Sequence, residues 1–219
     1  MTDWRMYLVT SGNDRRTVEV AAAAARGGAG VVQVRHKQGG DRELLALVTA
    51  VAAAVERANP DTRVVVDDAT DVAWAARRAG AAVHGVHLGQ DDLPVEAARQ
   101  ILGPDALVGL TTGTLELVQR AQQQAGVVDY LGAGPFRPTP TKDSGRAPLG
   151  VEGYRPLVQA SRIPVLAIGD VTPAEVEALA GTGIAGVCMA RHVMQAADPE
   201  ALVRGVLAGY ERGRLAAQT

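Results

Sequence analysis

Short apolar runs alternate with longer amphipathic segments along the whole chain. Runs of four or five apolar residues are typical of strands that are buried on both faces of a parallel sheet. The longer segments follow a helical pattern, and the first of them stops at Gly27 and Gly28, a typical helix end. The predicted strands cover residues 6–10, 31–34, 63–66, 85–88, 107–110, 127–131, 164–168 and 186–189. The predicted helices cover residues 17–26, 41–58, 71–78, 115–124, 151–160 and 199–213, and two more begin at Pro94 and Pro173.

This alternation of strand and helix predicts an α/β fold with a parallel sheet. Eight successive strand–helix units favour a closed (β/α)8 TIM barrel, and a doubly wound open sheet is the alternative. The composition does not change abruptly along the chain, and no internal repeat or low-complexity linker interrupts it. We therefore expect residues 1–219 to form a single TIM-barrel domain.

The stretch from residue 132 to residue 150 departs from the pattern. Three of its four prolines, Pro135, Pro138 and Pro140, lie within six residues and exclude a helix or a central strand there, because each removes a backbone donor. A long polar loop between a strand and a helix is usually functional or disordered. Two threonine hydroxyls and a lysine in the loop favour an anion-binding role, and an exposed linker is the alternative.

Composition narrows the classes of function. The chain has 219 residues, 47% of them hydrophobic, and a formal net charge of −2, which gives no general basic surface for nucleic acid. No apolar run is long enough to cross a bilayer, and the N-terminus does not resemble a signal peptide. The one cysteine, Cys188, excludes an internal disulfide and fits a reducing compartment. The sequence predicts a cytoplasmic protein and is compatible with a homo-oligomer.

The polar residues gather where the predicted strands end, which is the face that carries the active site in TIM barrels. Gln33, Arg35 and Lys37 alternate along an extended segment, so their side chains point to one side. The next two strands end in the pairs Asp67-Asp68 and Asp91-Asp92. Neighbouring strands lie about 5 Å apart, and carboxylates from both can reach one cation. Oxygen ligands of this kind suit Mg²⁺, although aspartate pairs also often cap helices.

Hydroxyls and a second lysine extend this ring of polar strand ends. Thr111 ends the fifth predicted strand, and Thr139, Thr141 and Lys142 lie in the proline-rich loop. Lys37 and Lys142 are the only lysines among 22 basic residues, and both follow predicted strands. Cations, acids able to hold Mg²⁺ and hydroxyls at one mouth predict a site for a small phosphorylated molecule, where metal and cations stabilise a leaving diphosphate.

Four motifs make the chain resemble the thiamine phosphate synthase family over nearly its whole length. They are Y-L-V-T from Tyr7, Q-V-R-H-K from Gln33, G-V-H-L-G-Q-D-D-L-P from Gly85 and G-P-F-R-P-T-P-T-K from Gly134. The family joins a hydroxymethylpyrimidine diphosphate to a thiazole phosphate and releases pyrophosphate, with Mg²⁺ as cofactor. The resemblance therefore implies a transferase of thiamine biosynthesis.

The resemblance also implies roles for individual residues. Arg35 and Lys142 would be the catalytic cations, and Asp68 and Asp92 would hold Mg²⁺. The pyrimidine diphosphate would lie against Gln33, Arg35, Lys37, Asp67, Thr111 and Lys142. The thiazole phosphate would lie against Thr139, Thr141, Gly169, Ala190 and Arg191.

Several positions depart from the family pattern. Asp67 stands where the family usually has asparagine, and Gly113 where it usually has histidine. Asp170 replaces a glycine after the seventh strand, and its charge would repel a phosphate there. Arg191 replaces a serine and either neutralises Asp170 or binds the phosphate itself. We expect diphosphate binding to be kept and the thiazole half of the site to be altered.

Two other functions remain open at this point. A thiazole tautomerase of the same barrel type would transfer a proton on a thiazole phosphate, using His36, His87 or Asp170 as acid or base. A non-catalytic relative would bind a pyrimidine or thiamine phosphate and act as a sensor.

Overall fold

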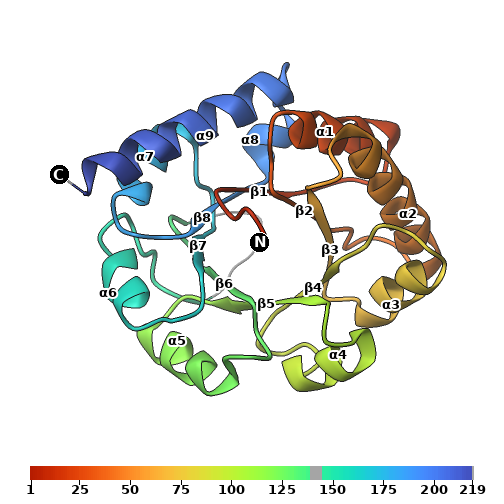
Figure 1. Cartoon of the computed structure of the whole chain (residues 1–219), viewed down its shortest axis with the longest axis horizontal. Coiled ribbons are helices and arrows are strands. Elements are labelled where there is room, and N and C mark those ends of the chain that lie inside the picture. The colour runs from red at the N-terminus through yellow and green to blue at the C-terminus, as the bar shows by residue number, and fades with distance from the viewer. Residues whose placement is uncertain (139–144, 219) are drawn as a thin grey trace.

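The computed structural model describes residues 1–138 and 145–218, and in it the strands close into a parallel barrel surrounded by helices (Figure 1). Each strand pairs with the next along the chain, and β8 pairs with β1 to close the ring. The predicted TIM barrel is therefore confirmed. The strands are β1 (Met6–Val9), β2 (Val31–Val34), β3 (Arg63–Asp67), β4 (Gly85–Leu88), β5 (Leu107–Thr112), β6 (Tyr130–Ala133), β7 (Val165–Ala167) and β8 (Gly186–Met189).

Helices follow the strands and form the outer layer. In chain order they are α1 (Arg15–Arg26), α2 (Asp41–Ala58), α3 (Thr70–Arg78), α4 (Val95–Leu102), α5 (Leu115–Ala121), α6 (Tyr154–Gln159), α7 (Val176–Ala180), α8 (Arg191–Met194) and α9 (Pro199–Ala216). Two 3₁₀ turns, η1 (Gln122–Gln124) and η2 (Pro173–Glu175), lie before β6 and α7. Within the described ranges, no helix has the length and apolar character needed to cross a membrane.

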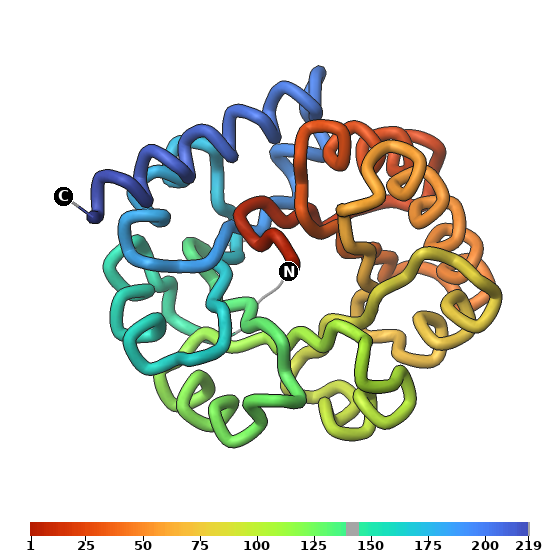
Figure 2. The backbone as a smooth tube through the Cα atoms, viewed as in Figure 1, coloured from red at the N-terminus to blue at the C-terminus, as the bar shows by residue number. Residues whose placement is uncertain are grey.

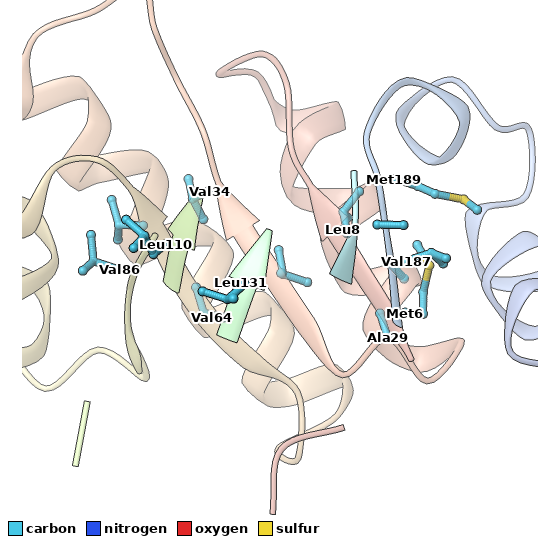
Figure 3. Packing of buried hydrophobic residues seen from close by; sticks show 14 of the residues in the cluster. Met6, Leu8, Ala29, Val34, Val64, Val86, Leu110, Leu131, Val187 and Met189 are labelled. Carbon is cyan, nitrogen blue, oxygen red and sulfur yellow. The ribbon is translucent and has the colours of Figure 1, made fainter. Parts of the chain in front are cut away.

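Alternation along the strands divides the apolar residues between two cores. Side chains such as Leu8, Val64 and Leu131 point outward and pack beneath the helices (Figure 3). Side chains at the alternate positions, such as Tyr7, Tyr130 and Cys188, fill the inside of the barrel. The valine-rich strands read as continuous apolar runs because both of their faces are buried.

The N-terminal segment closes the end of the barrel from which the strands start. It crosses the middle of the ring in the backbone view (Figure 2). Trp4 packs on the inner core, with its ring centroid 4.7 Å from that of Tyr130. Open space inside the barrel is therefore left at the opposite end, where the strands finish.

Some element boundaries differ from the sequence predictions. β6 begins at Tyr130 rather than at residue 127, because η1 and a turn in which Val128 N–H donates to Gln124 O take up the preceding apolar residues. α6 begins at Tyr154, after a turn at residues 150–153. The short helix α8 was not predicted. α9 continues to Ala216 despite its glycines; a Cβ on Gly213 would lie 2.0 Å from Glu177 O, so this glycine permits close packing of α9 on α7.

Candidate active site

A pocket of about 360 Å³ opens at the C-terminal ends of the strands. Its described lining comes from strand ends and the loops that follow them around the barrel. Among the predicted site residues, those in the lining are Gln33, Arg35, Lys37, Asp67, Asp68, Thr111, Gly169, Ala190 and Arg191. This is the face on which TIM barrels carry their active sites.

Oppositely charged side chains meet at the ends of β2 and β3. Arg35 Nε lies 3.3 Å from Asp67 Oδ2, and Lys37 Nζ lies 3.2 Å from the same oxygen. Lys37 also pairs with Asp68 Oδ2. The two strands are direct neighbours in register, with Val34 opposite Val66, so the residues that follow them are held together. Arg35 and Lys37 therefore line the same pocket as Gln33 and lie against the first aspartate pair.

Lys37 remains charged in this setting. Burial lowers its pKa, but the hydrogen bond to Asp68 and the charge of Asp67 raise the pKa by more, so the pKa lies above its usual value. Lys37 is therefore an ammonium group at neutral pH, about half exposed and able to meet an anion in the pocket.

Two aspartates in the pocket lining have a left-handed backbone. Asp68 and Asp170 both have φ of 60°, a region in which a residue with a Cβ costs about 1 kcal/mol or more. Each follows a strand, β3 and β7 respectively, and each carboxylate is paired with a cation. Strained backbone at two acidic positions of one pocket is typical of a functional site.

Asp92, the second predicted metal ligand, is placed differently from Asp68. Its Oδ2 accepts a 2.6 Å hydrogen bond from Gly89 N–H in the loop after β4, and it is absent from the described lining of the pocket. Gly89 itself lines the pocket, so Asp92 supports the rim from behind. Its Oδ1 accepts no hydrogen bond from any described residue.

Asp170 and Arg191 form an ion pair on the opposite side of the pocket. Arg191 donates from Nη2 to Asp170 Oδ1 at 2.6 Å. Of the two roles that the sequence left open for Arg191, this contact corresponds to neutralisation of Asp170. Gly169 and Ala190 line the pocket beside them, and a Cβ on Gly169 would lie 2.6 Å from Pro135 Cα.

A buried polar chain runs from Thr111 of β5 to Asp67 of β3. Thr111 Oγ1 lies 2.9 Å from His87 Nε2, and His87 Nδ1 lies 3.1 Å from the Tyr130 hydroxyl. The Tyr130 hydroxyl is 2.7 Å from that of Tyr7, which donates to Gln33 Oε1 at 2.7 Å. Gln33 Nε2 then donates to Asp67 Oδ1.

The sequence did not single out Tyr7, Tyr130 or Arg146. The tyrosines occupy inward positions of β1 and β6, and a large polar residue within an apolar strand was the signal available for them. Arg146 lines the pocket from the loop after β6 and donates to Thr112 O at 2.7 Å. No sequence pattern distinguished Arg146 from the other arginines.

The remaining predicted residues fall elsewhere. Thr139, Thr141 and Lys142 lie outside the residues that the structure describes. His36 is absent from the described lining of the pocket, and its Nε2 is 3.8 Å from Glu43 Oε2. Gly113 has φ of 155°, and a Cβ there would lie 2.0 Å from Gly134 O, so a side chain at this position needs the β6 loop to move.

Comparison with known proteins identifies the family. The family model described as thiamine monophosphate synthase matches residues 6–193. The chain belongs to this family. Thiamine-phosphate synthase of Corynebacterium jeikeium is 59% identical over 208 residues and 95% of either chain, and that of Corynebacterium efficiens is 55% identical over 97% of either chain.

Solved structures agree with this assignment. A thiamine phosphate pyrophosphorylase from Pyrococcus furiosus superimposes with a TM-score of 0.83 at 29% identity, covering 97% of this chain and 98% of the other. A 3-hexulose-6-phosphate synthase superimposes with a TM-score of 0.65 at 19% identity, which reflects the barrel fold alone. The family resemblance carried by the four sequence motifs is confirmed.

Proposed function

We propose that this protein is a thiamine-phosphate synthase. It condenses 4-amino-2-methyl-5-hydroxymethylpyrimidine diphosphate with 4-methyl-5-(2-phosphoethyl)thiazole and releases pyrophosphate. The observation that carries the proposal is the pairing of Arg35 and Lys37 with Asp67 and Asp68 at the mouth of a barrel of this family. The high identity to relatives named for this activity supports it.

The wall formed by β2 and β3 binds the pyrimidine diphosphate in this proposal. Arg35 and Lys37 offer two positive charges to the diphosphate, and Asp67 holds both side chains toward the pocket. Gln33 and Thr111 face the pyrimidine ring from opposite sides of the pocket. Lys142, outside the described residues, is proposed as a third cation on the diphosphate.

The bond changes require charge stabilisation rather than a general base. The C–O bond between the pyrimidine methylene and the diphosphate breaks, and pyrophosphate leaves with the electron pair. Arg35 and Lys142 stabilise the charge that develops on it. The electron-rich ring supports the resulting cation, and the thiazole nitrogen forms the new C–N bond with its lone pair. No proton has to be removed at that nitrogen.

Asp68, which lines this mouth, fits the Mg²⁺ ion that the family implies, and Asp92 would join it by giving up its hydrogen bond from Gly89 N–H. Among the described residues, no group of three His, Cys, Asp or Glu side chains could hold a metal. Two hard oxygen donors, Asp68 and Asp92, suit Mg²⁺, which usually takes one or two carboxylates and keeps water and phosphate oxygens. The bound ion would supply positive charge beside the leaving diphosphate. Lys37 would share Asp68 with it.

The thiazole phosphate is proposed to lie against Gly169, Ala190 and Arg191, with Thr139 and Thr141 on the loop after β6. Arg191 supplies the cation of this group, and its ion pair with Asp170 competes with the phosphate for the same guanidinium. Binding of the acceptor therefore requires Arg191 to exchange at least part of that contact.

Replacing Asp170 with glycine is expected to lower the KM for thiazole phosphate about 5- to 20-fold, because it removes a nearby negative charge and frees Arg191. Glycine also accepts the positive φ at this position without strain. Asp170→Asn, which removes the charge and tolerates the same φ, should give most of the effect. Steady-state kinetics with the thiazole varied provide the measurement. A raised KM in both variants would mean that Asp170 positions Arg191 instead of repelling the phosphate.

Two alternatives are separated from this proposal by one assay. The purified protein is incubated with the pyrimidine diphosphate, the thiazole phosphate and Mg²⁺, and thiamine phosphate is followed by chromatography. The expected result is product that depends on all three components. Isomerisation of a thiazole carboxylate phosphate in place of condensation would favour a tautomerase. Tight pyrimidine binding without product would favour a sensor.

The wider setting of this activity is also proposed. The substrates are small phosphorylated molecules, and the single cysteine, Cys188, is buried inside the barrel as a thiol whose pKa burial raises. A chain with one cysteine and therefore no internal disulfide fits a reducing compartment, and it is proposed to act in the cytoplasm.

A further inference from the structure

The polar chain inside the barrel has a fixed starting point at Asp67. Arg35 and Lys37 have only donor groups, and both pair with Asp67 Oδ2, so this carboxylate acts as a hydrogen-bond acceptor in the site. Its other oxygen, Oδ1, therefore accepts from the amide nitrogen of Gln33. This contact fixes which end of the Gln33 amide points toward the barrel interior: the carbonyl oxygen Oε1.

The direction of the next two hydrogen bonds follows from the proton count. Gln33 Oε1 has no proton, so Tyr7 must donate its single hydroxyl proton to it, over 2.7 Å. The Tyr7 oxygen can then only accept, and Tyr130 donates to it over 2.7 Å. Burial raises the pKa of both tyrosines well above 10, so each keeps its proton at neutral pH.

The same count fixes the tautomer of His87. The Tyr130 proton is already used, so the contact of 3.1 Å between the Tyr130 oxygen and His87 Nδ1 requires a proton on Nδ1. His87 is buried, with 7% of its surface exposed. In the neutral ring Nε2 is then an acceptor, and Thr111 donates its hydroxyl proton to it over 2.9 Å.

Two glycines provide the space for this arrangement. A Cβ on Gly109 would lie 2.1 Å from Tyr130 Cζ and 2.5 Å from His87 Nδ1. A Cβ on Gly132 would lie 3.1 Å from His87 Cε1. The two glycines lie in β5 and β6, next to the barrel interior. Because neither has a side chain, they leave room for Tyr130 and His87.

We propose that this chain determines whether the pyrimidine subsite offers a hydrogen-bond donor or an acceptor. Each group in it donates to the next, in the order Thr111, His87, Tyr130, Tyr7, Gln33, Asp67. Thr111 lines the pocket with its proton turned away toward His87, so it offers the ligand only oxygen lone pairs. It therefore accepts from an N–H of the ligand and disfavours an oxo group at the same place. His87, Tyr130 and Tyr7 act as positioning residues, with His87 held as the Nδ1–H tautomer. The identification of the ligand as a pyrimidine rests on the proposed function, whereas the tautomer of His87 does not.

The tautomer can be tested without any substrate. Protein labelled with ¹⁵N-histidine is studied by long-range ¹H–¹⁵N correlation at neutral pH, and His87 is assigned by its loss in His87→Gln. The expected pattern is a protonated Nδ1 and an unprotonated Nε2. A His87 ring with its proton on Nε2, or with both nitrogens protonated, would overturn the proposal.

Tyr7→Phe tests whether the direction comes from Asp67. It removes the acceptor for the Tyr130 proton, which can then turn to His87 Nδ1 and drive the ring toward the Nε2–H form. Tyr154→Phe is the matched control, because its buried hydroxyl donates to Ala133 O at 2.9 Å and takes no part in the chain. We expect the His87 signals to change in Tyr7→Phe and to stay unchanged in Tyr154→Phe. Unchanged signals in both variants would overturn the proposed chain.

The preference of the pyrimidine subsite for an amino group over an oxo group is measured with two ligands. They are the 4-aminopyrimidine diphosphate and the analogue in which an oxo group replaces the amino group. Calorimetry on the wild type should show at least about 100-fold tighter binding of the amino ligand. Tyr7→Phe should reduce this ratio about tenfold, and Tyr154→Phe should keep it. Equal binding of both ligands to the wild type would overturn the acceptor role of Thr111. Failure of either ligand to bind, with His87 in the Nδ1–H form, would contradict the proposed function and leave the tautomer assignment standing.

Discussion

Replacing Arg35 with alanine is expected to lower kcat for thiamine phosphate formation about 100- to 1,000-fold, the effect typical of removing one group that stabilises developing charge. Arg35 lines the pocket, and its guanidinium lies against Asp67, 3.3 Å away through Nε. Asp67 keeps Lys37 as a partner in the variant, 3.2 Å away, so the substitution does not leave a buried carboxylate without a cation. The fold should therefore survive, and the loss should appear in turnover.

Two further variants make this result specific. Arg35→Lys keeps the charge but loses the planar guanidinium, and it should recover only part of the activity. Arg137→Ala removes an arginine whose Nη2 is 2.6 Å from Glu175 Oε1 and which is absent from the described lining of the pocket. Its kcat should stay within about twofold of wild type. If Arg35→Ala and Arg137→Ala had equal turnover, Arg35 would have no role in leaving-group stabilisation.

Asp68→Asn is expected to weaken Mg²⁺ binding by at least about 10- to 100-fold and to lower activity at limiting Mg²⁺ by a similar factor. Asparagine tolerates the φ of 60° at this position, so the backbone after β3 should be preserved. The substitution removes one of the two proposed carboxylate ligands and the charge that Lys37 contacts. Activity is titrated with Mg²⁺, and Mn²⁺ binding in the presence of pyrophosphate is followed independently by electron paramagnetic resonance.

The matched control for this prediction is Asp71→Asn. Asp71 is exposed in the first turn of α3, three residues further along the chain, and does not line the described pocket. It should leave the metal titration unchanged. Wild-type Mn²⁺ affinity in Asp68→Asn would remove Asp68 from the metal site, even if activity fell for another reason such as the lost contact with Lys37.

The barrel was predictable because its signal is local and repeated. Each strand is a short apolar run, an amphipathic helical segment follows it, and eight such units in order leave few alternatives. The element boundaries that were predicted wrongly lie where local sequence signals conflict. Val127 and Val128 look like strand residues, yet the chain there is still turning out of η1, and Asp129 anchors it by accepting from Val108 N–H at 2.7 Å.

The site was predictable only in part. Alternation along one strand correctly grouped Gln33, Arg35 and Lys37, because the side-chain direction in a strand follows from its pleat. The partners of these residues depend on which strand lies alongside and in which register. Asp68 therefore came out in the pocket, whereas Asp92, an equally plausible carboxylate in the sequence, turned back to bind Gly89 N–H.

The sequence by itself determined the fold class, the family and the face of the barrel that carries the chemistry, because periodicity and motifs are written along the chain. Only the tertiary structure decided which groups share a hydrogen bond. Tyr7 and Tyr130 are 123 residues apart in sequence, and their hydroxyls meet because closure of the barrel brings β1 and β6 to face each other across its interior. A hydrogen bond depends on tenths of an ångström, and this precision comes from packing rather than from residue pattern.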